Sequence, residues 1–123
     1  MDTVSELDKR KKLLLRTRVW IEDEEGKVLM GEGRAVFLEL IDRTGSINKA
    51  AKKLGMSYRA LWGKLKTTEK ALGFKFIRSQ GRAGSFLTPE GKQFLENYLE
   101  LKRRCIETDN RIFREIFSAG EKD

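Results

Sequence analysis

The stretch SINKAAKKLGMSYRALWGKLKTTEKAL, residues 46–72, predicts two helices joined by a very short turn. The first helix begins after Ser46, a preferred N-cap residue, and ends at Gly55. The second begins after Ser57 and ends at Gly73. Residues suited to a buried face recur at helical spacing in both helices: Ile47, Ala50, Ala51 and Leu54 in the first, and Leu61, Leu65, Thr68 and Leu72 in the second.

The connection between these helices consists of only Gly55 and Met56. So short a turn forces the helices to cross at a large angle, and close crossing requires small residues. Ala51, four residues before Gly55, is such a residue. The combination is typical of a helix-turn-helix. The alternative is a generic three-helix core that binds no ligand.

Residues upstream of this pair predict a further helix and a hairpin. The helix runs from about residue 34 to residue 44 and ends at Gly45. Its buried face is expected to contain Phe37, Leu40, Ile41 and Thr44. Residues 18–30 predict a β-hairpin around an acidic turn, in which Gly26 supplies the positive φ. The first dozen residues are polar and charged and predict a short helix or a loose arm.

Downstream of the pair, the pattern changes from helix to strand. Residues 74–78 predict a strand, residues 79–85 a glycine-containing loop, and residues 86–87 the returning strand. The sequence Thr88-Pro89-Glu90 is a strong helix start, and no helix breaker follows before Gly120. The last helix therefore spans about 29 residues, or roughly 43 Å at 1.5 Å per residue.

Together these elements predict a mainly α (α+β) fold: a winged helix-turn-helix with an N-terminal β-hairpin and a long C-terminal dimerisation helix. A chain of 123 residues has room for one compact domain and not for two. We divide it into residues 1–30 (N-terminal arm and hairpin), 31–88 (winged helix-turn-helix) and 89–118 (dimerisation helix).

The charge of the chain is concentrated in the predicted helix-turn-helix. Lys and Arg outnumber Asp and Glu by 26 to 19 over the whole chain, which gives a net charge of +7. Residues 46–88 alone carry ten basic residues and one acid, Glu69, and therefore +9: the bases are Lys49, Lys52, Lys53, Arg59, Lys64, Lys66, Lys70, Lys75, Arg78 and Arg82. A field of one sign is the expected footprint of a polyanion partner. The alternative is a solvated cationic face without a ligand.

Several classes of function are disfavoured by composition. The chain has no His and a single Cys, Cys105, which argues against histidine acid–base catalysis, a His/Cys metal site and an intrachain disulfide. We therefore expect no enzyme, no cofactor and no metal. No apolar run is long enough for a membrane span or a signal peptide, so a cytoplasmic protein is expected.

The outer face of the second helix of the pair carries five candidate DNA contacts: Ser57, Tyr58, Arg59, Trp62 and Lys66. Ser57 and Tyr58 lie at the helix N-terminus and can meet phosphates or base edges, and Arg59 can donate two hydrogen bonds to a guanine. Lys66 can meet a phosphate. For Trp62 two interpretations remain: it contacts sugar or a thymine methyl, or it covers the edge of the core.

The loop at residues 79–85 is the predicted wing. Arg78 and Arg82 flank Gly81 and Gly84, so this loop can approach a phosphate backbone or a minor groove closely. The alternative is an ordinary surface hairpin. Its position directly after a basic helix favours the wing.

A series of motifs resembles a known family. These are GEGRA (31–35), TGSI (44–47), AA (50–51), GMSYR (55–59), Trp62 and LTPEG (87–91). In this order they resemble the N-terminal domain of ModE-type regulators, which are bacterial and archaeal molybdenum-responsive transcription factors. Leu72-Gly73, followed by the wing and LTPEG, is also similar to the LysR-type DNA-binding domain.

The resemblance implies roles for particular residues. The third helix of that family enters the major groove, the wing touches the flank, and the helix after the wing pairs two subunits. The expected base or backbone readers are Ser57, Tyr58, Arg59, Trp62 and Lys66, while Ser46, Asn48 and Lys49 are expected at a phosphate. Two features depart from the family: the wing is shorter, and the chain ends at Asp123 without the molybdate-binding domains that normally follow. We therefore expect no molybdate site within this chain.

The last helix independently predicts a homodimer. Its apolar residues form two neighbouring stripes, and so long a helix overhangs its domain, which leaves the far end exposed unless it is paired. The predicted interface is Phe94, Tyr98, Leu101, Cys105, Ile106, Ile112, Phe113 and Ile116. The alternative is that this end folds back onto the N-terminal hairpin.

These features predict a transcriptional regulator that binds double-stranded DNA as a homodimer. Helix 57–72 would enter the major groove, and the 79–85 wing would contact the flanking backbone. Two alternatives remain: a winged-helix module for a protein or RNA partner, and a non-specific, chromatin-like DNA binder. A protein partner would favour an apolar rather than a cationic outer face on helix 57–72.

Overall fold

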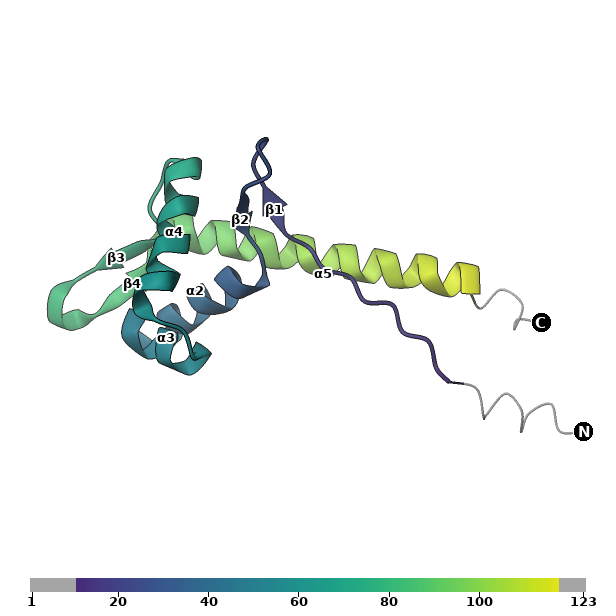
Figure 1. Cartoon of the computed structure of the whole chain (residues 1–123), viewed down its shortest axis with the longest axis horizontal. Coiled ribbons are helices and arrows are strands. Elements are labelled where there is room, and N and C mark those ends of the chain that lie inside the picture. Colours follow the sequence, from purple (N-terminus) through teal and green to yellow (C-terminus); the bar gives the residue numbers. More distant parts are fainter. Residues whose placement is uncertain (1–10, 118–123) are drawn as a thin grey trace, which may run out of the picture.

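The computed structural model describes residues 11–117 (Figure 1). Three helices, α2 (Glu32–Thr44), α3 (Ile47–Leu54) and α4 (Tyr58–Leu72), form the centre of the domain. A two-stranded hairpin precedes them, and a second hairpin and a long helix follow. The predicted winged helix-turn-helix fold is confirmed. The prediction of a short helix or loose arm falls mostly on residues 1–10, which lie outside the described part of the chain.

Helix boundaries follow the capping residues. The side chain of Ser46 accepts a hydrogen bond from the Lys49 amide at 3.1 Å, and that of Ser57 accepts one from the Ala60 amide at 3.1 Å. Each central helix ends at a glycine in the left-handed conformation, with φ of 72° at Gly45, 66° at Gly55 and 81° at Gly73. These signals mark both ends of α3 and α4 and the end of α2, and each predicted boundary of the three helices lies within about two residues of the observed one.

The N-terminal hairpin consists of β1 (Ile21–Glu22) and β2 (Val28–Met30), paired antiparallel with Ile21 opposite Met30. The wing hairpin consists of β3 (Ile77–Ser79), a short 3₁₀ turn η1 (Gly81–Ala83) and β4 (Ser85–Leu87). Both hairpins were predicted.

The predicted strand at residues 74–78 begins too early, since β3 starts at Ile77. The backbone groups of residues 75–76 form hydrogen bonds with Glu69 and Thr88 rather than with the opposite strand. The Phe76 amide donates to the Glu69 carboxylate at 2.7 Å, and the Phe76 carbonyl accepts from the Thr88 amide at 2.8 Å. The Lys75 carbonyl accepts from the Thr88 hydroxyl. Strand pairing therefore begins only at Ile77.

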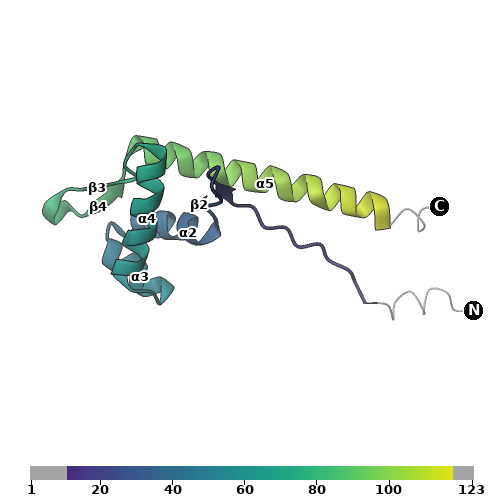
Figure 2. The same ribbon diagram turned by 45° about the horizontal axis from the view of Figure 1, so that its top comes forward.

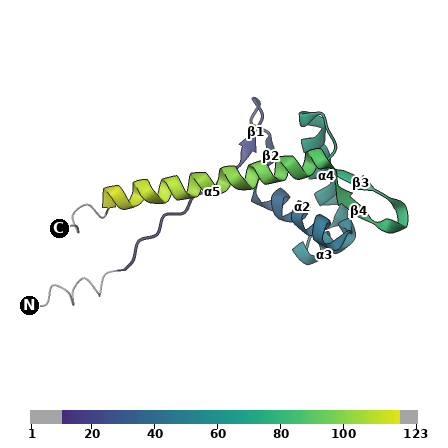
Figure 3. The ribbon, with the colours of Figure 1, turned by 180° about the vertical axis from the view of Figure 1, so that it is seen from behind.

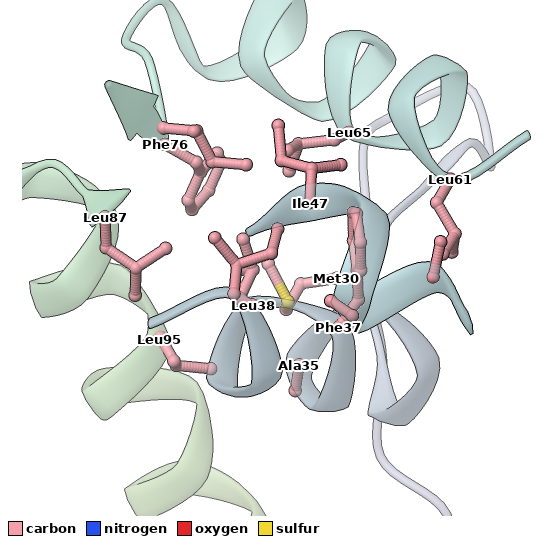
Figure 4. Close-up of a cluster of buried hydrophobic side chains, with 14 of the residues drawn as sticks. Met30, Ala35, Phe37, Leu38, Ile47, Leu61, Leu65, Phe76, Leu87 and Leu95 are labelled. Carbon is pink, nitrogen blue, oxygen red and sulfur yellow. The ribbon is translucent and has the colours of Figure 1, made fainter. Parts of the chain in front are cut away.

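One hydrophobic core joins all of these elements (Figure 4). The side chains of Met30, Phe37, Leu38, Leu65 and Phe76 are almost completely buried in it. The expected buried face of α2 needs correction. Leu38 takes a central place that was not predicted, whereas Leu40 and Thr44 lie only half-buried.

Two buried hydroxyl groups attach the helices to the N-terminal segment. Thr68 on α4 donates to the Leu29 carbonyl at 2.6 Å, and Tyr98 donates to the Val19 carbonyl at 2.7 Å. Thr68 is fully buried and Tyr98 is 1% exposed. Both contacts satisfy polar groups that would be costly to bury alone.

The long helix α5 (Pro89–Phe117) begins on the core and then leaves it (Figures 2 and 3). Its buried residues are Gly91, Leu95 and Tyr98, all in its first three turns. The segment before β1 lies on the same side of the domain as the far end of α5 and runs in the opposite direction to it, and the Thr17 hydroxyl donates to the Asp109 carboxylate at 3.1 Å. Within residues 11–117, α5 is one continuous helix that leads away from the N-terminal hairpin, and the Thr17 contact to its far part comes from the segment before that hairpin.

Candidate nucleic-acid interface

The turn between α3 and α4 has the geometry that the sequence predicted. The Met56 amide donates to the Ala51 carbonyl at 3.1 Å, and the Gly55 amide donates to the Lys52 carbonyl at 3.1 Å. Ala51 is buried at the crossing of the two helices. Directly after this turn, at the start of α4, Ser57, Tyr58 and Arg59 are all exposed.

Side chains on one side of α4 are stacked into a column. The Tyr58 and Trp62 rings are stacked with centroids 6.2 Å apart, and Lys66 Nζ lies 4.4 Å from the centroid of the Trp62 ring. Trp62 is half-buried and packs against the core. The structure therefore supports the second interpretation of Trp62, cover for the edge of the core. Tyr58 and Arg59 are the more exposed groups.

Glu69 is a part of this site that sequence reasoning missed. It is only 7% exposed, accepts the Phe76 amide with one carboxylate oxygen, and pairs with Lys66 Nζ at 3.2 Å through the other. A buried carboxylate requires such partners. Lys66, whose side chain is 47% exposed, is consequently held between Trp62 and Glu69. The sequence did contain a signal for this role: Glu69 is the single acid among ten bases in residues 46–88, which marks it as a partner for one of them.

The start of α3 lies beside the base of the wing. The Gly45 carbonyl accepts the Ser85 amide at 2.9 Å, and the Phe86 ring lies against Gly45. A Cβ at Gly84 would come within 2.5 Å of the Gly45 carbonyl oxygen. Gly84 is therefore needed for the contact between the wing and the helix pair.

This contact joins two groups of predicted residues that are far apart in sequence. Asn48 and Lys49 are exposed in the first turn of α3, next to the Ser46 cap. Arg78 and Arg82 are exposed on the wing, which extends beyond α3 and α4 (Figure 1). The structure thus attaches the wing to the α3 N-terminus.

The basic side chains of residues 46–88 form a solvent-accessible surface. All ten of them are exposed. Within residues 11–117, Lys66 is the one member of this set that makes an ion pair. The other nine charges remain available to an anionic partner, which is the electrostatic requirement for binding a phosphate backbone.

The predicted dimer contacts on α5 divide into two groups. Tyr98 lies in the core of its own domain, so the prediction that it forms part of an intersubunit surface is corrected. Phe94 is half-buried and packs against Phe74 and Phe76, with ring centroids 6.0 and 5.6 Å away. The remaining six residues are exposed or half-exposed along the overhanging part of the helix: Leu101, Cys105, Ile106, Ile112, Phe113 and Ile116.

Metal-binding and membrane-spanning features are both missing from the described part of the chain. Residues 11–117 contain no cluster of three His, Cys, Asp or Glu side chains suited to a metal ion. No helix in this range combines the length and the apolar character that crossing a membrane requires.

Comparison with known proteins identifies the class of this domain. Residues 35–92 match the family described as "Bacterial regulatory helix-turn-helix protein, lysR family". The LysR family transcriptional regulator CbnR has a similar fold, with a TM-score of 0.55 and 21% identity over 69% of this chain and 29% of that chain. The complex of BenM_DBD with benA site 1 DNA gives a TM-score of 0.55 and 22% identity over 71% and 97%. Residues 35–92 are therefore similar to the LysR-type helix-turn-helix domain in sequence, and the winged helix-turn-helix fold is shared with these structures.

Two curated proteins whose names refer to molybdenum share a higher sequence identity with this chain than the LysR-type structures do. The molybdenum-pterin-binding protein MopB of Rhodobacter capsulatus is 36% identical over 73 residues, which are 56% of this chain and 27% of that protein. The molybdenum transport protein ModE of Herbaspirillum seropedicae is 35% identical over 75 residues, which are 58% and 28%. The predicted resemblance to the N-terminal region of ModE-type proteins is thus confirmed. The chain spans little more than a quarter of the length of these relatives.

Proposed function

We propose that this protein is a sequence-specific transcriptional regulator that binds double-stranded DNA as a homodimer. In this proposal α4 enters the major groove and the wing lies on the flanking backbone. The observation that carries it is the exposed N-terminal end of α4, from which Tyr58 and Arg59 project. The same part of the chain, residues 46–88, carries nine exposed positive charges that make no ion pair within residues 11–117, on α3, α4 and the wing.

Base recognition is assigned to the first turns of α4. Arg59 is exposed, and its planar guanidinium can donate two parallel hydrogen bonds to guanine O6 and N7. Tyr58 lies beside it and is stacked on Trp62, which restricts its side-chain freedom before DNA binds. Lys66 is held by Glu69, so we assign it to a backbone contact near the helix rather than to a base.

Backbone contact is assigned to the α3 N-terminus and the wing. Asn48 and Lys49 lie at the positive end of the α3 dipole, a favourable position for a phosphate. Arg78 and Arg82 extend the cationic surface to one side. Contacts of this kind fix the register of the protein on the duplex but do not read sequence.

A homodimer is favoured by the overhanging part of α5. Ile112 is 45% exposed and Ile116 is 65% exposed, and both lie on the same face of the helix. Pairing two copies along this face would bury the apolar surface and present two α4 helices to one duplex. We expect half-sites about one turn of DNA apart, roughly 34 Å. Such a regulator would act in the cytoplasm, where its DNA is.

Several structural neighbours are complexes with DNA, among them the BenM_DBD complex with benA site 1 DNA and the CbnR_DBD–DNA complex, the latter at a TM-score of 0.51 and 24% identity. Their fold supports the docking geometry proposed here. The likeness to MopB and ModE covers about a quarter of those proteins, so it carries no proposal of molybdenum binding by these residues.

The test compares a duplex from the upstream region of this gene with a shuffled duplex of equal length, across a salt series. Specific binding predicts a preference of at least ~10³-fold for the native duplex, and a steep decrease of both affinities with salt. Equal affinities with equal slopes would indicate a non-specific binder. Absence of salt-dependent binding would reject DNA as the partner and favour a protein.

Two variants distinguish the loss of a base contact from the loss of a positive charge alone. Arg59→Ala should lower affinity for the native duplex by roughly 10- to 100-fold and reduce the preference over the shuffled one. Lys27→Ala removes one exposed positive charge from the hairpin turn rather than from the helix pair or the wing, and should leave the preference unchanged. Equal effects of the two substitutions would contradict the assignment of Arg59.

A further inference from the structure

A cavity of about 420 Å³ lies between the N-terminal hairpin, the start of α2 and the turn of the helix pair. Its apolar wall comes from β2, α3, the turn after α3, and α4, which contribute Val28, Leu54, Met56 and Leu61 respectively. Cavities of this size suit a small organic molecule, and mostly apolar walls favour one with an aliphatic or aromatic body. The cavity is separate from the exposed face of α4 that carries Arg59.

The charged residues that line this cavity are Arg34 and Lys64, and no acidic side chain is among the lining residues. Arg34 Nε is buried and finds no hydrogen-bond partner within residues 11–117. Burial also lowers the pKa of the Arg34 guanidinium from its ordinary value. Because Nε itself is closed off from solvent, an anion in the cavity would meet this side chain at its Nη groups, which pair readily with a carboxylate or phosphate.

The backbone at the mouth of the cavity adds to this preference for an anion. Gly31 and Gly33 line it, and Gly31 is the N-cap of α2. No side chain caps this helix, unlike α3 and α4, where Ser46 and Ser57 accept backbone amides. The positive end of the α2 dipole lies in the same region as Arg34, and Glu32, the acid in this first turn, pairs with Lys102 on α5.

We propose that this cavity binds a small organic acid, with its carboxylate on Arg34 and near Lys64, and its apolar body against Val28, Leu54, Met56 and Leu61. The guanidinium fork matches a carboxylate in a bidentate geometry. The apolar wall excludes a small inorganic anion as the preferred ligand, because such an ion would leave that wall in contact with water. Through Met56 and Leu61 the ligand would contact the turn and first turns of α4.

Octanoate is a suitable probe, with one carboxylate and an unbranched apolar body. We expect the full chain, without DNA, to bind it saturably in calorimetry with a Kd of about 0.1–1 mM, a typical efficiency for about ten non-hydrogen atoms. Octan-1-ol, which has the same body and no charge, should bind at least about tenfold more weakly. The absence of DNA makes this test independent of the proposed regulatory function.

Two variants test the site in different ways. Arg34→Met removes the charge and should weaken octanoate binding by roughly 10- to 100-fold. Gly33→Leu adds a side chain to the cavity lining, and a Cβ there meets no atom within 4 Å, so the fold should tolerate it. This variant should abolish binding while keeping the melting temperature of the ligand-free protein.

Lys70→Met is the matched control, because Lys70 is an exposed base on α4 outside the cavity lining. It should bind octanoate as the unmodified protein does. Undiminished binding by Gly33→Leu, or an equal loss in Arg34→Met and Lys70→Met, would overturn the proposal, as would a failure to detect saturable binding up to about ten times the expected Kd.

Discussion

The two halves of α5 carry the same kind of apolar pattern but have opposite environments. In the first half, Leu95 and Tyr98 are buried by α2 and the N-terminal segment. In the second half, Ile112 and Ile116 follow at helical spacing and are largely exposed. Apolar periodicity therefore identifies a face that needs cover, but it does not say whether the cover comes from the same chain or from another copy.

The largest expected effect comes from a cavity in the first half. Leu95 is 5% exposed and packs in the core, so Leu95→Ala should lower the free energy of unfolding by about 2–5 kcal/mol. Chemical denaturation measures this change. Ile112→Ala removes a similar side chain from the second half. At a concentration where the protein is monomeric, it should change stability by less than about 0.5 kcal/mol. Comparable losses would mean that the second half is covered within one chain.

Substitutions in the second half of α5 should change the oligomeric state of the protein rather than its stability. The double substitution of Ile112→Asp and Ile116→Asp places two charges on the exposed apolar face, and it should convert the dimer to a monomer in light scattering. The winged domain should keep its melting profile. Arg114→Asp is a control with the same change in net charge on the opposite side of α5, and it should remain dimeric. A dimer that survives the double substitution contradicts the proposed interface.

Two glycine-to-alanine substitutions, one where α5 meets the core and one in the middle of α4, should have opposite effects on stability. Gly91 is buried, and a Cβ there would lie 2.7 Å from the Phe76 carbonyl oxygen and 2.8 Å from its Cα. Gly91→Ala should therefore destabilise the fold by about 1–3 kcal/mol. At Gly63, in the middle of α4, an added Cβ would meet no atom within 4 Å, so Gly63→Ala should stabilise by up to about 1 kcal/mol. Thermal unfolding of both variants tests the two signs.

Local sequence signals were sufficient to predict where the helices begin and end, but not to predict the contacts between elements. Serine caps and glycine stops fixed α3 and α4 because they act within a few residues of the backbone groups that they satisfy. The start of β3 was wrong because Phe76 bonds to Glu69 and Thr88, seven and twelve residues away. Propensity for strand does not report such a competing partner.

In the candidate site, too, some features follow from the local sequence and others depend on contacts between distant residues. The exposure of Tyr58 and Arg59 followed from the helical period of α4 alone. The role of Gly84 depends on its contact with Gly45, thirty-nine residues earlier, and no pattern in the wing sequence reveals that neighbour. The organic-acid cavity is likewise formed by residues from the hairpin, α2, α3 and α4. Tertiary packing, rather than local pattern, creates both features.

The smallest expected effect concerns an exposed ion pair that joins α2 to the middle of α5. Lys102 Nζ lies 2.8 Å from Glu32 Oε1. The hydrogen bond and charge of Lys102 lower the pKa of Glu32 from 4.5, and Glu32 in turn raises the pKa of Lys102 from 10.5. Stability from the lowered carboxyl pKa is present above pH 4.5 and is lost as pH falls through the folded value. Stability from the raised ammonium pKa is present below pH 10.5 and is lost as pH rises through its folded value.

Glu32→Gln should therefore lower the melting temperature by a few degrees at most near neutral pH, because the pair is solvated. The difference from the unmodified protein should disappear in acid and in strong alkali, and it should decrease with added salt. Glu24→Gln, an equivalent change in the exposed hairpin turn, should show no such pH window. A pH-independent difference for Glu32→Gln would show that packing of this side chain, rather than its charge, attaches α2 to the first half of α5.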